Sequence, residues 1–293
     1  MAVKILLDTD IGSDIDDAVC LAYLLANPEC ELFGITTVTS EPVKRAKLAS
    51  VLCKIAGKDI PIYPGVENPL IIPQLQTSAK QAGALKRWEH KNNFPEGEAV
   101  EFLRSTIRKN PGEIILLTIG PLTNIGLLFS IDPEIPYLLK GLYSMSGNFL
   151  RKDKKLPKLE WNAMGDYHAS AIVYNSKIKV HRSFGLDVTS KVIMKKNEFK
   201  EKFSHHNLFK PVLDFSKAWF EEWNGITFHD PLAAVAIFNK NVCGYEKGLV
   251  EIELEKKKER GLTKWKHVSN GKHEIAVTVN AGKFFENYFS VFK

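Results

Sequence analysis

The sequence predicts an α/β protein in which a mostly parallel, Rossmann-like sheet is flanked by helices, with a C-terminal helical and β-hairpin cap. Short apolar strand patterns alternate with longer helical patterns through the N-terminal part of the chain, Gly and Pro mark the turns, and strand patterns return near the C-terminus. Parallel strands joined by helices require right-handed crossovers, which place an active site at the carboxyl ends of the strands.

The N-terminal part has the βαβαβ order that defines this class. Apolar, β-branched segments read as strands, and the longer periodic segments between them read as helices. The expected elements are a strand at Lys4–Leu7, a helix from Asp16 to Ala26, a strand at Glu31–Val38, a helix at Pro42–Ala56 and a short strand at Ile60–Tyr63.

The segment Glu67–Pro95 has no clean period and contains several breakers, so we expect an irregular excursion that can cover the site. The alternation then resumes. The expected elements are a helix at Glu98–Lys109, strands at Ile114–Ile119 and Leu142–Met145, a helix at Asp166–Asn175 and a strand at Ile178–His181.

The last third is expected to be helical between Asn197 and Asn239 and then to form a β-meander. Gly261 and Asn270-Gly271 are its turn signals. The strands are expected at Gly248–Leu254, Lys264–Val268 and Glu274–Val279, before a closing helix at Ala281–Phe292. Without an internal repeat or a low-complexity linker, residues 1–293 are predicted to form a single domain.

Composition limits the function classes. The chain of 293 residues is 44% hydrophobic and 25% charged with a net charge of +6, and its basic stretches have no interleaved aromatic motif, so nucleic acid is not an expected partner. The four scattered cysteines are expected to be reduced thiols. Without a signal-peptide pattern or an apolar run of membrane-spanning length, we expect a cytoplasmic protein with no membrane partner.

An aspartate-rich loop follows the first strand. Five aspartates fall within ten residues, at Asp8, Asp10, Asp14, Asp16 and Asp17. One or two would be ordinary helix caps, but five repel one another unless an oxygen-seeking cation such as Ca²⁺ or Mg²⁺ joins them. An EF-hand loop starting at Asp8 is excluded, because Ser13 and Val19 stand where that motif needs Gly and Glu.

Three distant segments can complete a site. His229-Asp230-Pro231 opens a predicted helix, which places a carboxylate at a positive helix end, although Asp230 could equally be a plain cap. The carbonyl of Ile119 ends a central strand and can point at a cation. Glu160 and Asn162 lie on one side of an extended segment around Trp161, in a pattern suited to a polyhydroxylated substrate.

The sequence resembles the inosine-uridine-preferring nucleoside hydrolase family over nearly its whole length. The family's opening D-x-D-P-G-x-D-D-A is similar to Asp8-Thr9-Asp10-Ile11-Gly12 followed by Asp16-Asp17-Ala18. The other matching motifs occur in the family's order: I-T-T-V at Ile35–Val38, G-P-L-T-N at Gly120–Asn124, E-F-N as Glu160-Trp161-Asn162, G-L-D-x-T at Gly185–Thr189 and H-D-P at His229–Pro231.

The resemblance implies hydrolysis of the N-glycosidic bond of a nucleoside with Ca²⁺ as cofactor. It implies Asp10, Asp17, Asp230 and the Ile119 carbonyl as metal ligands, with Asp10 also activating a metal-bound water for attack without a covalent intermediate. Asp16 would bind the ribose hydroxyls. Glu160 and Asn162 would hold the 5′ end of the sugar, and His229 would protonate or hydrogen-bond the departing base. Members of the family are commonly homo-oligomers, so a homodimer or homotetramer is expected.

The departures from the family pattern lie mainly on the base side. Two extra residues precede the Asp16-Asp17 pair, so Asp14 has no counterpart, and support for the metal site is its expected role. Further substrate-binding candidates are Glu41, close to the sugar, Asn148, after a strand, and Trp88, which could stack on a base. The family's histidine-glycine pair is replaced in the region Ala82–Trp88.

Two other functions remain open at this point. A haloacid-dehalogenase-type phosphatase also begins with D-x-D, but its G-D-x-x-x-D element would end at Ser170 here. A catalytically impaired member of the family that only binds a ribosyl ligand would keep the cation. An assay for release of base from a nucleoside distinguishes a nucleoside hydrolase from the phosphatase and from the ribosyl-binding protein.

Overall fold

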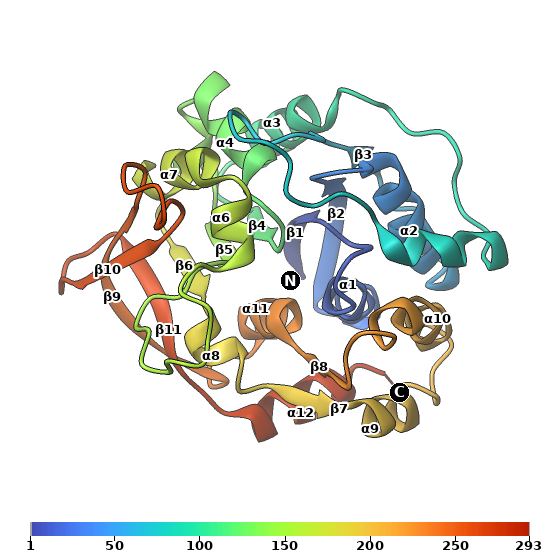
Figure 1. The fold of residues 1–293 in the computed structure, drawn as a ribbon. Coiled ribbons are helices and arrows are strands. Elements are labelled where there is room, and N and C mark those ends of the chain that lie inside the picture. The colour runs from blue at the N-terminus through green and yellow to red at the C-terminus, as the bar shows by residue number, and fades with distance from the viewer. Residues whose placement is uncertain (1, 293) are drawn as a thin grey trace.

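The computed structural model describes residues 2–292 and is built on one long sheet of nine strands (Figure 1). The strand order is β10-β9-β11-β6-β5-β4-β1-β2-β3. All pairs from β11 to β3 are parallel, whereas β9 pairs antiparallel with both β10 and β11. The fold class predicted from the sequence is therefore confirmed.

The elements of the first half alternate as expected. They are β1 (Val3–Thr9), α1 (Asp16–Ala26), β2 (Cys30–Thr37), α2 (Pro42–Ile55), β3 (Ile62–Pro64), the 3₁₀ helix η1 (Lys80–Arg87), α3 (Ala99–Lys109), β4 (Ile115–Thr118), α4 (Thr123–Ile131), α5 (Ile135–Leu138) and β5 (Gly141–Met145).

The second half contains α6 (Trp161–Gly165), α7 (Tyr167–Asn175), β6 (His181–Phe184), α8 (Leu186–Thr189), β7 (Ile193–Lys195), α9 (Lys196–Lys202), α10 (Phe209–Trp219), β8 (Gly225–Thr227), α11 (His229–Phe238), β9 (Cys243–Ile252), β10 (Thr263–His267), β11 (His273–Val279) and α12 (Ala281–Ser290). The short strands β7 and β8 pair with each other outside the main sheet.

Two hydrophobic cores lie on opposite faces of the sheet. Side chains alternate along a strand, so Ile5 and Leu7 of β1 enter one core while Leu6 enters the other. Helices α1, α2, α11 and α12 cover the first face, and α3, α4 and α7 cover the second (Figure 1). Because strands covered on both faces are apolar throughout, they read as the continuous apolar runs seen in the sequence.

Two expectations for the second half need correction. The strand expected at Ile178–His181 lies instead at His181–Phe184, because β5 pairs with β6 in the register Leu142↔His181. The polar side chains of His181, Arg182 and Ser183 interrupt the apolar pattern by which a buried strand is recognised, so the sequence did not indicate a strand there. The three expected terminal strands are present, but they do not form a meander: β9 lies between β10 and β11, and β11 joins the central sheet through its parallel pairing with β6.

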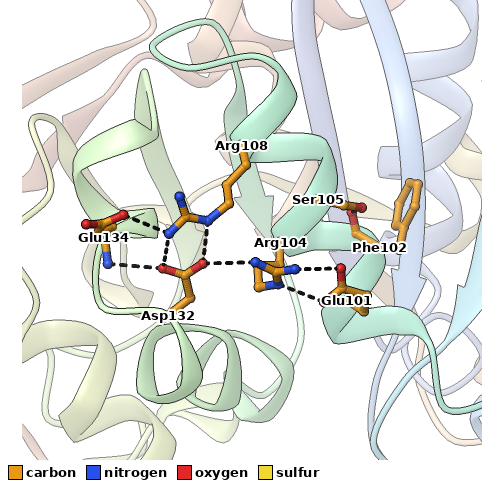
Figure 2. A network of polar contacts seen from close by, with 7 residues as sticks. All are labelled: Glu101, Phe102, Arg104, Ser105, Arg108, Asp132 and Glu134. Carbon is orange, nitrogen blue, oxygen red and sulfur yellow. Dashed lines mark hydrogen bonds and ion pairs between the residues drawn. The ribbon is translucent and has the colours of Figure 1, made fainter.

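An ion-pair network fastens α3 to the loop after α4, outside the pocket described below (Figure 2). Arg108 donates from Nε and Nη2 to the two carboxylate oxygens of Asp132 at 2.6 and 2.7 Å, and from Nη2 to Glu134 at 2.8 Å. Arg104 pairs with Glu101 at 2.7 Å and lies 3.5 Å from Asp132. The two-pronged contact fixes the orientation of both partners more firmly than a single ion pair would.

Across residues 2–292, no helix combines the length and the apolar character needed to span a membrane.

Candidate active site

A pocket of about 690 Å³ opens where β1, β4 and β5 end, three neighbouring strands of the sheet. Each of these strands brings one residue to the pocket lining: Asp10 directly follows β1, Ile119 directly follows β4, and Met145 is the last residue of β5. This is the edge at which open parallel sheets bind ligands. The other walls come from the irregular segment before η1, from the start of α6, and from α10 and α11.

A cluster of three buried carboxylates lies at the floor of the pocket. Asp16, Asp17 and Asp230 each offer an oxygen within 4.8 Å of the others, and they are 4%, 3% and 4% exposed. Asp16 and Asp17 begin α1 and Asp230 is in the first turn of α11, so the positive ends of two helix dipoles meet here. The backbone N–H of Asp230 donates to Asp16 at 3.1 Å, which joins the two helices.

Burial and mutual repulsion make this cluster costly to ionise. Burial, with Asp14 as the largest neighbouring charge, raises the pKa of Asp16 to about 8. Burial and the neighbouring aspartates also hold the pKa values of Asp17 and Asp230 well above their ordinary range. A divalent cation removes this repulsion, and a set of hard carboxylate oxygens is what Ca²⁺ or Mg²⁺ prefers. The residues present therefore fit such a metal ion.

Asp10 lines the pocket beside the cluster. Burial raises the pKa of Asp10 to about 6, while the positive charge of Arg45 and the side-chain amide of Gln76 counteract this effect. Gly120 lets the strands approach here, because a Cβ at that position would lie 2.9 Å from the Asp10 carboxylate.

Arg45 is fully buried behind the aspartate loop, and the sequence reading missed it. Its guanidinium donates to the carbonyl oxygens of Asp10, Ile11 and Ser40 and to Ser13 Oγ, with the Ser40 bond at 2.7 Å. It therefore fixes the curl of the loop with backbone contacts and supplies a positive charge close to the carboxylates. The sequence signal was weak: Arg45 lies one helical turn before the apolar residues Leu48 and Ala49, but Lys44 and Lys47 beside it indicate an exposed face.

Ile119, Asn162 and Glu160 meet on the opposite wall. Asn162 Nδ2 donates to the carbonyl of Ile119 at 3.0 Å and to that of Met145 at 3.1 Å, so it ties the ends of β4 and β5 together. Glu160 caps α6: its carboxylate accepts the backbone N–H groups of Asn162 (2.8 Å), Ala163 (2.9 Å) and Gly147 (2.8 Å). These contacts fix the start of α6 against the strand ends.

His229 lines the pocket at the start of α11. Its Nδ1 lies 2.7 Å from the hydroxyl oxygen of Thr189, in α8. Burial lowers the pKa of His229 to about 4, so the ring is neutral at physiological pH. With Nδ1 engaged by Thr189, the other ring nitrogen is the one available to a ligand.

Asp8 and Asn124 support the site from behind. Asn124 Nδ2 donates to Asp8 at 2.7 Å and to the carbonyl of Thr37 at 3.0 Å, and its Oδ1 accepts the N–H of Val66 at 2.9 Å. Burial raises the pKa of Asp8 to about 7. Asp166 is the N-cap of α7, since its carboxylate accepts the backbone N–H of Ala169 at 3.0 Å.

The structure brings together Asp10, Asp16, Asp17, Ile119, Glu160, Asn162, His229 and Asp230 around one pocket. Three predicted substrate-binding residues lie outside its lining. Glu41 accepts the N–H of Ala79 at 2.9 Å and pairs with Lys44. The Trp88 indole donates to Asp214 of α10 at 2.9 Å, and Asn148 donates to the carbonyl of Pro157 at 2.8 Å. These three side chains therefore make polar contacts with other parts of the chain and do not line the pocket.

Other pocket residues were not predicted from the sequence. Gln76 comes from the irregular segment, and Trp219 and Trp223 stack on each other with ring centroids 5.5 Å apart. Lys80 and Glu222 form an exposed ion pair at 2.5 Å. No spacing rule marks a residue of an irregular loop, and the tryptophans read as ordinary helix positions.

Comparison with solved structures shows which proteins share this fold. A purine-preferring ribonucleoside hydrolase from Gardnerella vaginalis superposes with a TM-score of 0.85 at 20% identity, over 99% of this chain and 98% of that one. Mixed α/β folds of nucleoside hydrolases therefore share this architecture.

The sequence relationship is more specific. The profile described as inosine-uridine preferring nucleoside hydrolase matches residues 5–286, so the chain belongs to that family. Uridine nucleosidase 1 of Arabidopsis thaliana is 28% identical over 86% of this chain and 79% of its own length. The non-specific ribonucleoside hydrolase RihC of an Escherichia coli strain is 33% identical over 66% of this chain and 64% of its own length. Membership makes the protein an enzyme of the nucleoside hydrolase class.

Proposed function

We propose that this protein hydrolyses the N-glycosidic bond of a ribonucleoside or related N-riboside to free base and ribose, with Ca²⁺ as cofactor. The observation that carries the proposal is the cluster of Asp16, Asp17 and Asp230 beside Asp10 in a pocket at the strand ends. The relatives named above act on ribonucleosides, which supports the same substrate class here.

Asp17 and Asp230 from the carboxylate cluster, with Asp10 and the carbonyl of Ile119 from the lining of the same pocket, would hold the cation. Asn162 engages one side of that carbonyl, and a carbonyl oxygen has a second lone pair. Asp16 would accept hydrogen bonds from the vicinal ribose hydroxyls. When bound, a divalent cation neutralises the carboxylates and lowers the pKa of adjacent water.

Asp10 is the proposed general base. A proton passes from the attacking water to a carboxylate oxygen of Asp10, the water oxygen bonds to C1′, and the C1′–N bond breaks with its electron pair leaving on the base. Burial raises the pKa of Asp10 to about 6 in the metal-free protein, and a bound cation would lower it, so the carboxylate would be ionised near neutral pH and able to accept the proton.

His229 would assist the departing base. Since its pKa is lowered by burial to about 4, we propose that the neutral ring donates a hydrogen bond from Nε2 while Thr189 donates to Nδ1. Glu160 and Asn162 would hold the 5′ end of the ribose. Trp161, Trp219 and Met164 give the pocket an apolar side suited to the face of a base.

The deciding experiment measures release of ribose and base from a panel of purine, pyrimidine and nicotinamide ribosides, with added Ca²⁺ and after chelation. We expect turnover that chelation abolishes and that Asp10→Ala loses without loss of the fold. Exposed Asp153→Ala, outside the pocket, is the matched control. Near-wild-type hydrolysis by the Asp10 variant refutes the assignment of the base. Phosphate release from p-nitrophenyl phosphate without base release identifies a phosphatase, and single-turnover binding without cleavage identifies a ribosyl-binding protein.

A further inference from the structure

Residues 74–80 are here called the strap. They follow β3 in the chain, end at the first residue of η1, and form part of the pocket lining. Within it Leu75, Gln76 and Lys80 contribute to the pocket lining. The strap has no regular secondary structure up to the start of η1, so its position depends on the individual contacts that its residues make.

The two extra residues of the aspartate loop, Ser13 and Asp14, serve as the docking point for this segment. Gln76 Nε2 donates to Ser13 Oγ, and Gln81, just beyond the strap, donates from Nε2 to the carbonyl oxygens of Ser13 (2.9 Å) and Asp14 (2.8 Å). Arg45 donates to the same Ser13 hydroxyl at 3.1 Å. The insertion therefore links the buried arginine, the aspartate loop and the strap.

The other end of the Gln76 amide reaches across the pocket. Its Oε1 accepts the indole N–H of Trp161 at 3.0 Å. The Trp161 backbone is fixed, because it directly follows the Glu160 cap of α6, but its side chain is 43% exposed. For an indole so placed, one hydrogen bond to its only polar atom selects a single orientation among several accessible ones.

We propose that Gln76 is a positioning residue that couples the two sides of the pocket: its amide nitrogen holds the loop bearing Asp10, and its oxygen holds the Trp161 indole as a wall for the base. This inference rests on the proposed function. One side chain thereby aligns the group that takes the proton and the surface against which the leaving group lies. Misplacement of either side by a small distance slows an oriented reaction.

The two ends of the amide can be separated by substitution. Gln76→Glu retains an oxygen acceptor for the indole but loses the donor to Ser13 and adds a negative charge beside Asp10, so we expect kcat to fall at least about tenfold with KM within about twofold of wild type. Trp161→Phe keeps an aromatic ring but loses the donor, so KM should rise about threefold with little change in kcat. Gln76→Ala should show both effects, and the double variant Gln76→Ala/Trp161→Phe should have the KM of Gln76→Ala alone.

Ile71→Ala is the matched control, since Ile71 is 72% exposed in the same irregular segment and lies outside the pocket lining. If Gln76→Ala has the kinetics of this control, or if Gln76→Glu and Gln76→Ala change kcat and KM identically, the proposal is wrong.

A second readout does not need turnover. The indole N–H resonance of Trp161 is identified in a ¹H–¹⁵N spectrum by its absence from Trp161→Phe, and its solvent exchange is then measured. We expect exchange to accelerate at least about tenfold in Gln76→Ala and to stay near wild type in Gln76→Glu. If the indole N–H of Trp161 exchanges equally fast in Gln76→Ala and in wild type, Gln76 does not hold Trp161 and the proposal is wrong. If the wild-type protein cleaves no riboside, the proposed function fails, while this measurement still decides whether Gln76 holds Trp161.

Discussion

Relative to an Asp16→Asn variant, the metal-free protein should lose stability as pH rises from 5 to 7, and Ca²⁺ should abolish this relative loss. Burial raises the pKa of Asp16 from its ordinary value of 3.8 to about 8 in the fold, so between these values the folded chain holds a proton that the unfolded chain releases. Stability falls with pH wherever the folded state binds more protons.

The expected size follows from one such proton. Each pH unit costs about 1.4 kcal/mol, so the interval from pH 5 to 7 lowers the free energy of unfolding by at least about 2.7 kcal/mol. For a chain of this size, that corresponds to a fall in Tm of about 5 °C. Asp17 and Asp230, whose pKa values are also raised by burial, act in the same direction.

Calcium should reverse the trend because it binds the ionised carboxylates. At 100 times its dissociation constant, a ligand stabilises the fold by about 2.7 kcal/mol, and this gain should grow with pH. The assay is thermal unfolding followed by circular dichroism at several pH values, with chelator and with Ca²⁺. The Tm of wild type relative to Asp16→Asn should fall over this pH range in the metal-free protein, whereas the Tm of wild type relative to Asp153→Asn should stay constant. A metal-free difference between wild type and Asp16→Asn that stays level or grows in favour of wild type between pH 5 and 7, or that Ca²⁺ leaves unchanged, would refute this reasoning.

Three further predictions concern single side chains. His229→Ala should slow purine nucleosides about 100-fold but p-nitrophenyl riboside, whose leaving group needs little assistance, by less than about fivefold, and steady-state kinetics with equal losses would remove His229 from this role. Asn124→Leu should lower the free energy of unfolding in urea by about 3 kcal/mol, because it leaves the Val66 N–H without its partner and takes a donor from the buried Asp8 carboxylate, and an unchanged midpoint would contradict the supporting role. His181 is buried against Tyr174, neither ring nitrogen has a hydrogen-bond partner among the described residues, and burial holds its pKa well below 6.5, so the contribution of this histidine to stability should fall as pH drops below 6.5. His181→Phe should reduce that fall and add about 1 kcal/mol at pH 7, and a Phe variant as acid-labile as wild type would show that other groups dominate.

The sequence predicted the carboxylate side of the pocket well, for a physical reason. Asp10, Asp16 and Asp17 lie within one short loop after a recognisable strand, and parallel topology brings the end of β4 to the same edge. Asp230 was found because a proline-started helix gives a local signal. In each case the information is carried by a few neighbouring residues.

The base side was not predictable in the same way. The path of residues 67–95 depends on long-range contacts such as those of Glu41 with Ala79 and of Trp88 with Asp214, which no periodicity reveals. Glu41 and Trp88 were therefore expected near the substrate, while Gln76 was overlooked. The single domain, the homodimer or homotetramer and the cytoplasmic location expected from the sequence stay predictions.

The bond between the Asp230 amide and Asp16 joins residues 214 positions apart. The carboxylate cluster cannot form from the N-terminal loop alone, so a growing chain has no complete site until α11 has been synthesised and packed against α1. Contacts this distant in sequence are expensive in loop-closure entropy and slow to form. Affinity for a divalent ion should therefore be a late signal during refolding, one that distinguishes native molecules from compact intermediates with an ordered amino-terminal half.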